Sequence, residues 1–256
     1  MAADAPILEL REVTKTFAGL MAVNHVSTRV MPGQIKAIIG PNGAGKTTLY
    51  NLITGLYEIT SGEILFQGES ITGLMPHQIA ERGITRTFQN IKLFANMSVL
   101  ENVLVGQHSR THTGFLAAAL RTRHARQEER EAVARAMDLL ELVGLADQAD
   151  QGATQLPFGL QRKLEIARAL ASQPALLLLD EPAAGLNQVE GEALARLIRQ
   201  IRDSGVTVLL VEHDMELVMD LADEILVLDY GQAIADDRPH VVRQDEKVIT
   251  AYLGYD

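Results

Sequence analysis

Cysteine is absent from this chain of 256 residues, which excludes disulfide bonds and zinc–thiolate sites and permits a reducing cytosol. No apolar run approaches the roughly 20 residues that a membrane-spanning helix needs. The N-terminal sequence MAADAPILEL lacks a basic segment followed by an apolar one, so no secretory signal is expected. The net charge is −10 without a long Lys/Arg run, which argues against a nucleic-acid partner, whose binding depends on neutralised phosphates.

What remains is the composition of an ordinary soluble globular protein, 47% hydrophobic and 22% charged, long enough for one large domain or two small ones. Apolar runs at 7–13, 23–30 and 35–39 predict strands, and a further strand is expected over 84–89, ending in Gln89. From about residue 90 to 170 the pattern is helical, with Ser98 and Glu101 spaced as a capping box. Later strands at 175–179 and 206–211 alternate with helices, which predicts an α/β fold around a parallel sheet.

The stretch from residue 36 to 56 carries the strongest signal, because a short apolar run leads into GPNGAGKTT and then into a helical pattern. This is the strand–loop–helix context of a phosphate-binding loop, in which glycines let backbone N–H groups converge on phosphate oxygens. Lys46 is then expected to reach the β- and γ-phosphates and the Thr47 hydroxyl to bind Mg²⁺. The sequence therefore predicts a nucleoside-triphosphate site.

Acidic residues follow a second apolar run, since LLLL at 176–179 leads directly into Asp180 and Glu181. In a parallel sheet the carboxyl ends of the strands lie beside the phosphate loop. Asp180 is placed to hold Mg²⁺ through water and Glu181 to accept a proton from the attacking water. Gln89 and His213 each follow a predicted strand, so they either reach the γ-phosphate edge of this site or are ordinary solvated residues.

In this order, the motifs resemble those of the ATP-binding subunits of ABC transporters over essentially the whole chain. GPNGAGKTT resembles Walker A, Gln89 the Q-loop, LPFGLQ at 156–161 the signature motif, LLLLDE Walker B, AAGLN at 183–187 the D-loop and His213 the switch histidine. The finer matches RTFQNIKLF at 86–94, the Arg-rich insert near 107–130, EHDMELVM at 212–219 and YLG at 252–254 resemble the LivG-type ATPases of branched-chain amino-acid importers.

The resemblance implies one ABC ATPase domain over residues 1–256: a RecA-like parallel-sheet core and an N-terminal antiparallel β subdomain at 1–89 and 166–256, and a helical subdomain at about 90–165. It implies ATP and Mg²⁺ as cofactors, with Glu181, His213 and Lys46 as catalytic residues and with Thr47, Gln89 and Asp180 around the metal. The ATP-binding residues that it implies are Phe17, Gly40, Pro41, Asn42, Gly43, Ala44, Gly45, Lys46, Thr47, Thr48 and Gln89. The signature residues that act on a partner's ATP are Leu156, Pro157, Phe158, Gly159, Leu160 and Gln161, and Asn187 belongs to the D-loop.

Two motifs, the signature and the D-loop, depart from the family pattern. The common signature LSGGQ has a serine where this chain has Pro157 and a glycine where it has Phe158, so the serine hydroxyl is missing. The N–H groups of Phe158 and Gly159 at a helix start would still bind phosphate; the alternative is one weakened site. Asn187 replaces a common aspartate and keeps a hydrogen-bonding side chain.

The implied function is ATP hydrolysis in a nucleotide-sandwich dimer on the cytoplasmic face of the membrane. The dimer, formed with a second ABC ATPase of the same or a sister type, would drive a permease and, indirectly, an external solute-binding protein. Residues 90–97 are expected either to dock the permease or to form a satellite core, and the basic cluster at 121–126 to be a solvated helix face or a contact with lipid headgroups or a partner. Phe17 either stacks on adenine or is a packed turn residue. The alternatives are an importer of another solute, a soluble ABC ATPase acting on DNA or ribosomes, and a regulatory module that does not hydrolyse ATP.

Overall fold

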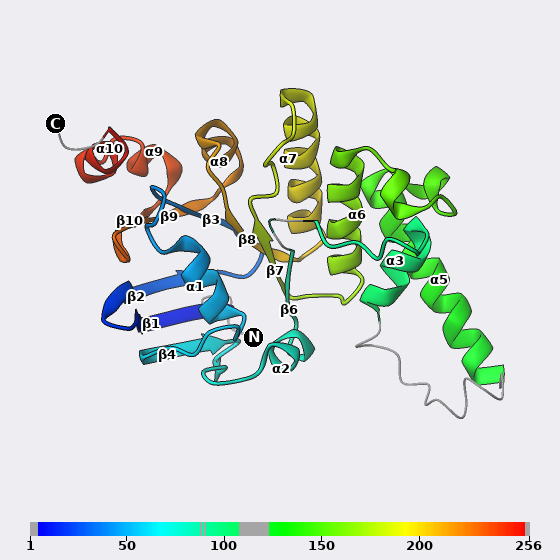
Figure 1. The fold of residues 1–256 in the computed structure, drawn as a ribbon, viewed down its shortest axis with the longest axis horizontal. Helices are drawn as coiled ribbons and strands as arrows, with labels where there is room; N and C mark the ends of the chain where they lie inside the picture. The colour runs from blue at the N-terminus through cyan, green and yellow to red at the C-terminus, as the bar shows by residue number, and fades with distance from the viewer. Residues whose placement is uncertain (1–4, 88, 90, 108–122, 254–256) are drawn as a thin grey trace.

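The chain forms two sheets that lie on either side of the helix at 46–53 (Figure 1). The computed structural model describes residues 5–87, 89, 91–107 and 123–253, and for residues 123–126 and 253 it describes the backbone alone. The side chains of the basic cluster at 121–126, most of the insert near 107–130, and residues 88, 90 and 254 of the finer sequence matches therefore lie outside the described part of the chain. Within the described part of the chain, no helix combines the length and apolar character needed to cross a bilayer.

The larger sheet has the strand order β10-β9-β3-β8-β7-β6. All of its pairs are parallel except the hairpin of β9 and β10, so the predicted parallel sheet is confirmed. Its strands are β3 (Ile35–Ile39), β6 (Ile84–Arg86), β7 (Leu176–Asp180), β8 (Thr207–Val211), β9 (Glu224–Asp229) and β10 (Gln232–Asp237).

The smaller sheet is antiparallel, with the order β2-β1-β4-β5. It is built from the N-terminal third of the chain, where alternating apolar residues favour strands that are buried on one face. Its strands are β1 (Leu8–Phe17), β2 (Leu20–Val30), β4 (Ser61–Phe66) and β5 (Glu69–Ser70).

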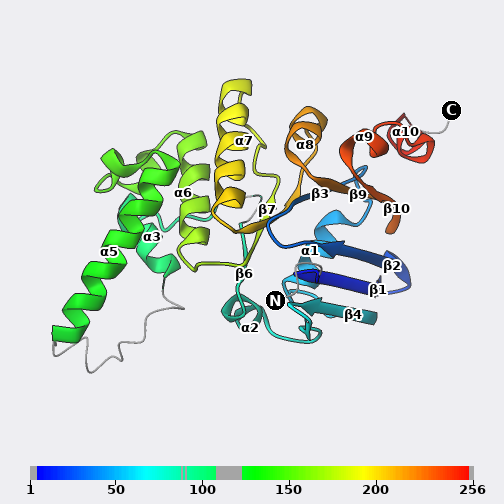
Figure 2. The ribbon, with the colours of Figure 1, turned by 180° about the vertical axis from the view of Figure 1, so that it is seen from behind.

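Helices cover both faces of the parallel sheet, and Figure 2 shows α3, α5 and α6 grouped at one end. The helices are α1 (Lys46–Ile53), α2 (Pro76–Glu81), α3 (Val99–Gly106), α5 (Arg123–Val143), α6 (Phe158–Leu170), α7 (Gln188–Asp203), α8 (Met215–Leu221), α9 (Pro239–Val242) and α10 (Glu246–Leu253), with 3-10 turns at Ala146–Gln148 and Ala153–Gln155. The Ser98–Glu101 capping box at the start of α3 is confirmed.

The core is divided by the parallel sheet, because side chains of a strand point alternately to its two faces. Ile38 and Leu178 face α1 and the antiparallel sheet, whereas Ala37 and Leu179 face α6 and α7. The apolar runs before the phosphate loop and before Asp180 are buried along their whole length. Buried parallel strands fix the loops that follow them, and the predicted site lies in those loops.

One predicted strand is shorter than expected. β6 ends at Arg86, and Gln89 lies beyond it. The last ladder bond runs from the Thr87 N–H to the Leu178 carbonyl, whereas the Gln89 carbonyl accepts a hydrogen bond from Arg162 at 2.9 Å. The expectation that Gln89 ends a strand is therefore wrong, because its backbone is held by α6 instead of by β7.

Candidate functional site

The loop between β3 and α1 is held tightly from outside. A Cβ on Gly40, whose φ is 148°, would lie 2.1 Å from the Leu228 carbonyl oxygen, and one on Gly45, at φ 102°, would lie 2.4 Å from that of Ala22. Only glycine fits either position. The loop is thus clamped between β2 and the β9–β10 hairpin, which fixes the direction of its N–H groups.

Lys46 begins α1 and folds back into this loop. Its Nζ donates to the carbonyl oxygens of Gly40 at 2.6 Å and Pro41 at 2.9 Å, and the residue is 6% exposed. Burial lowers the pKa of Lys46, and the charge of Glu181 opposes that shift. A cation enclosed by backbone carbonyls is suited to pair with phosphate oxygens.

A cleft of about 280 Å³ opens above the loop. It brings together predicted residues from four separate regions of the chain, namely the phosphate loop and the segments around Gln89, Glu181 and His213. Its lining consists of Ala22, Asn42, Gly43, Ala44, Gly45, Lys46, Thr47, Thr48, Gln89, Glu181 and His213. The catalytic residues inferred from the resemblance, Lys46, Glu181 and His213, therefore face one space.

Glu181 is held on both sides in this cleft. Its Oε2 accepts from Gln89 Nε2 at 2.7 Å, and its Oε1 lies 2.7 Å from His213 Nε2. Its own N–H donates to the Val211 carbonyl at 2.9 Å, and its backbone is left-handed, with φ 46°. Loops after three neighbouring parallel strands thus fix one carboxylate beside the phosphate loop. His213 itself lies two residues past the end of β8.

Asp180 lies behind the cleft and does not belong to its lining. Its Oδ2 is 2.6 Å from Nη2 of Arg86, and the two side chains are 7% and 8% exposed. Arg86 also donates to Asn51 Oδ1 of α1 at 2.6 Å. Sequence reasoning missed Arg86; the signal was an arginine in a strand of a buried parallel sheet, where a charge requires a partner.

The donor set fits a magnesium ion that is shared with a nucleotide. Thr47 and Gln89 line the cleft, and Asp180 is the last residue of β7, directly before Glu181. These are oxygen donors, which Mg²⁺ prefers, and Mg²⁺ is usually bound by one or two carboxylates together with substrate phosphates. Among the described residues, no group of three or more His, Cys, Asp and Glu side chains could hold a metal ion.

Glu212 is a second residue that sequence reasoning missed. It is 3% exposed and accepts from the N–H of Ala183 at 2.7 Å and of His213 at 3.0 Å. Burial raises the pKa of the Glu212 carboxyl, although these N–H donors oppose the shift. Its carboxylate therefore ties the loop after β7 to the loop after β8. A charged residue directly after five buried ones was the available signal.

The predicted signature residues and Asn187 of the D-loop do not line the cleft. Leu156 is buried, Pro157 is the N-cap residue of α6, and Phe158 is 49% exposed. Gln161 Nε2 donates to the Leu156 carbonyl at 2.8 Å. Asn187 caps α7 through its Oδ1, which accepts from the Glu190 N–H at 3.0 Å. The exposed start of α6 leaves its first N–H groups outside the helical ladder.

Phe17 also lies outside the lining of the cleft. It ends β1, is 38% exposed, and meets the Tyr57 ring edge-on with centroids 5.2 Å apart. Lys15 Nζ lies 4.9 Å from the centre of the Phe17 ring. The ring is therefore partly packed and partly accessible.

Residues 23–184 match the protein family described as ABC transporter. The chain is 49% identical to the high-affinity branched-chain amino acid transport ATP-binding protein BraF of Pseudomonas aeruginosa, over 97% of this chain and 98% of that protein. It is 45% identical to LivG of Escherichia coli K12, a protein of the same description, over the same shares.

Among solved structures, an ATP-binding cassette of an ABC transporter in its ADP conformation matches with a TM-score of 0.86 and 33% identity, over 98% of this chain and all of that one. A dimeric cassette in a post-hydrolysis state, bound to ADP and Pi, matches with a TM-score of 0.76 and 26% identity, over 91% of this chain and 98% of that one.

Proposed function

Because the chain belongs to the ABC transporter family of ATP-binding proteins, we propose that it is the ATP-hydrolysing subunit of an importer of branched-chain amino acids. The substrate class follows from relatives whose names state it and which align with nearly the whole chain. The single observation that carries the hydrolytic role is the Glu181 carboxylate, fixed from both sides in the cleft above the phosphate loop.

The proposal assigns roles to residues of the cleft and to two residues outside its lining, Asp180 and Phe17. Lys46 and the loop N–H groups from Gly40 to Thr48 bind the phosphates and neutralise their charge. Glu181 accepts a proton from the attacking water, and His213 orients that carboxylate and contacts the γ-phosphate. Thr47, Gln89 and Asp180 would hold Mg²⁺, which supplies neutralising charge at the phosphates when bound. Phe17 would present its accessible ring to the adenine.

The signature residues and Asn187 act on the nucleotide of a second ABC ATPase subunit. These residues do not line the cleft of their own subunit. This, the exposure of Phe158 and the dimeric form of one similar cassette support the role. Pro157 supplies neither a hydroxyl nor an N–H, so we assign phosphate binding to the N–H groups of Phe158 and Gly159 at the start of α6.

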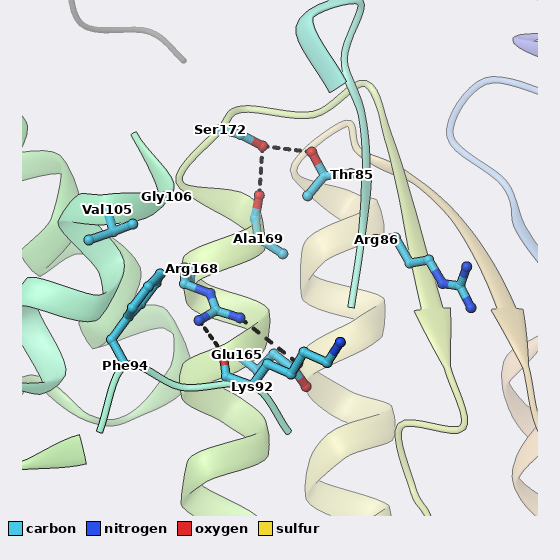
Figure 3. Close-up of a pocket in the computed structure, with 10 residues that line it drawn as sticks. All are labelled: Thr85, Arg86, Lys92, Phe94, Val105, Gly106, Glu165, Arg168, Ala169 and Ser172. Atoms are coloured by element: carbon cyan, nitrogen blue, oxygen red, sulfur yellow. Dashed lines mark hydrogen bonds and ion pairs between the residues drawn. The ribbon is translucent and has the colours of Figure 1, made fainter. Parts of the chain in front are cut away.

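The permease would dock at a groove of about 360 Å³ between β6, α3 and α6 (Figure 3). Phe94 and Val105 give it an apolar wall, while Lys92 and Arg168 add positive charge. This combination suits a short helix that carries apolar residues and an acidic one. Docking there would place the chain on the cytoplasmic face of the membrane, peripherally, with the solute-binding protein outside.

We propose a division of the chain into two parts with different functions. We assign residues 1–89 and 166–256 to the catalytic core with its β subdomain, and about 90–165 to a helical signature subdomain within one ABC ATPase domain. The boundary falls inside α6, so this helix belongs to both parts.

The proposal is tested by the ATPase rate of the chain reconstituted with its candidate permease and binding protein. Leucine, isoleucine and valine should each raise the rate, whereas unrelated amino acids should not. Stimulation by an unrelated solute alone would overturn the substrate class and keep the importer. Absence of hydrolysis by the reconstituted complex would overturn the enzymatic role itself.

A further inference from the structure

Three charged side chains follow each other along one face of α6. Arg162, Glu165 and Arg168 are three residues apart, a spacing that places side chains on the same side of a helix. Arg162 and Glu165 are each 1% exposed. Burying charges is costly unless they are paired, so the contacts of this α6 charge ladder must offset that cost.

The first contact of the ladder reaches the nucleotide cleft. Arg162 donates to Glu165 Oε2 at 3.0 Å and to the Gln89 carbonyl at 2.9 Å. The same guanidinium lies 5.9 Å from the centre of the Phe158 ring. That ring packs so closely on Gly185 of the D-loop that a Cβ there would be 3.1 Å from a ring carbon. One arginine thus joins the signature motif to the backbone of Gln89.

The last contact of the ladder reaches the groove described above. Arg168 donates to the Lys92 carbonyl and lies 4.0 Å from Glu165, and its guanidinium is 5.6 Å from the centre of the Phe94 ring. Burial lowers the pKa of Arg168, and the charge of Glu165 opposes that shift. Figure 3 shows Arg168 between Phe94, Lys92 and Glu165 on this wall of the groove.

We propose that Arg162, Glu165 and Arg168 are positioning residues that make α6 move together with the backbone at Gln89 and Lys92. Glu165 is the shared member, since it faces both arginines. Through the ladder, a shift of the groove wall displaces the signature motif, and a shift of Gln89 toward nucleotide displaces the start of α6. This inference rests on the proposed function, because it assigns a mechanical link within an ATP-driven subunit.

The test is hydrogen–deuterium exchange of the full chain with and without Mg²⁺ and a non-hydrolysable ATP analogue. In the wild type, nucleotide should slow exchange both in the peptide containing Gln89 and at the start of α6. In Glu165→Gln, the peptide containing Gln89 should keep its protection, because the Gln89 side chain reaches the cleft by itself. The response of α6 should be lost.

Two further variants keep the test informative. Arg168→Gln breaks the groove end of the ladder at a side chain that is 17% exposed, and it should fold even where Glu165→Gln, checked by circular dichroism, does not. Because the contact of Arg162 with the Gln89 carbonyl stays in place, this variant should lose the nucleotide response at the end of α6 around residue 168 and keep the response at the start of α6. Arg135→Gln removes an exposed arginine of α5, 3.9 Å from Glu131, and should leave both responses intact.

Responses of α6 in both ladder variants equal to the wild type would overturn the inference. The inference would also be overturned if nucleotide slowed exchange at Gln89 but not in α6 of the wild type. In that case the proposed function would still stand. Absence of any response in the wild type would instead reject ATP binding, and with it the function on which the inference rests.

Discussion

Replacing Arg86 by methionine should destabilise the protein strongly, because it leaves Asp180 charged and buried. The pair is 2.6 Å apart, with side chains 8% and 7% exposed. Removing one partner of a buried ion pair costs about 3–5 kcal/mol. For a chain of this size that lowers Tm by roughly 6–20 °C, at about 2–4 °C per kcal/mol. The measurement is the free energy of unfolding from urea titration, with Tm as a second reading.

The matched control is Arg196→Gln on α7. That arginine lies 4.0 Å from Glu192, with the side chains 63% and 59% exposed. Exposed ion pairs of this spacing on a helix contribute about 0.3–0.5 kcal/mol. The free energy of unfolding of the control should therefore stay close to that of the wild type.

A second substitution identifies the cause of the loss. Asp180→Asn in the Arg86→Met background removes the unpaired charge, so it should restore part of the lost stability. The reasoning is refuted if Arg86→Met costs no more than Arg196→Gln. It is also refuted if Asp180→Asn destabilises the Arg86→Met background further.

Three more predictions concern the cleft. Glu181→Gln should slow phosphate release roughly 10²–10⁴-fold, the usual contribution of a general base, while the affinity for a fluorescent ATP analogue survives; near-normal turnover would remove Glu181 from this role. Gly40→Ala should lower the affinity for the ATP analogue and the free energy of unfolding more than Gly43→Ala does. The added methyl at Gly40 would lie 2.1 Å from the Leu228 carbonyl oxygen, whereas nothing lies within 4 Å at Gly43. Equal effects of the two substitutions would contradict the tight packing of this loop against the β9–β10 hairpin. The pKa of Glu212 is raised in the folded chain, so at a pH just above the ordinary value of 4.5 the native chain retains a proton that the unfolded chain has released. The contribution of this carboxyl to the free energy of unfolding therefore falls as the pH rises from 4.5 through the pKa of the folded chain. The stability of Glu212→Gln relative to wild type, measured by urea unfolding, should therefore increase over that pH window; a constant difference would reject the shift.

Much of the fold could be predicted from the sequence because local signals agreed with it. The run before Gly40 forms the buried strand β3, and the leucines at 176–179 form the buried strand β7 together with Asp180. The Ser98–Glu101 spacing, predicted as a capping box, caps the start of α3. Where periodicity, turn residues and caps point to the same element, tertiary packing has little to override.

What the sequence could not supply was pairing across the chain. Arg86 and Asp180 are 94 positions apart, and their contact depends on β6 lying beside β7. The position of Gln89 was misassigned for the same reason, since its backbone partner, Arg162, comes from a helix 73 residues later. The structural role of Glu212 could not be predicted either, because its carboxylate joins the N–H of Ala183 in one loop to that of His213 in another.

The central claim is that ATP hydrolysis at the Glu181 cleft drives branched-chain amino-acid import. The most direct measurement is the initial rate of leucine uptake into proteoliposomes containing the permease and this chain, supplied with ATP and with binding protein on the opposite side. The account predicts uptake with the wild-type chain and its loss with Glu181→Gln. Equal uptake with both chains, or hydrolysis by the wild type without leucine accumulation, would contradict it.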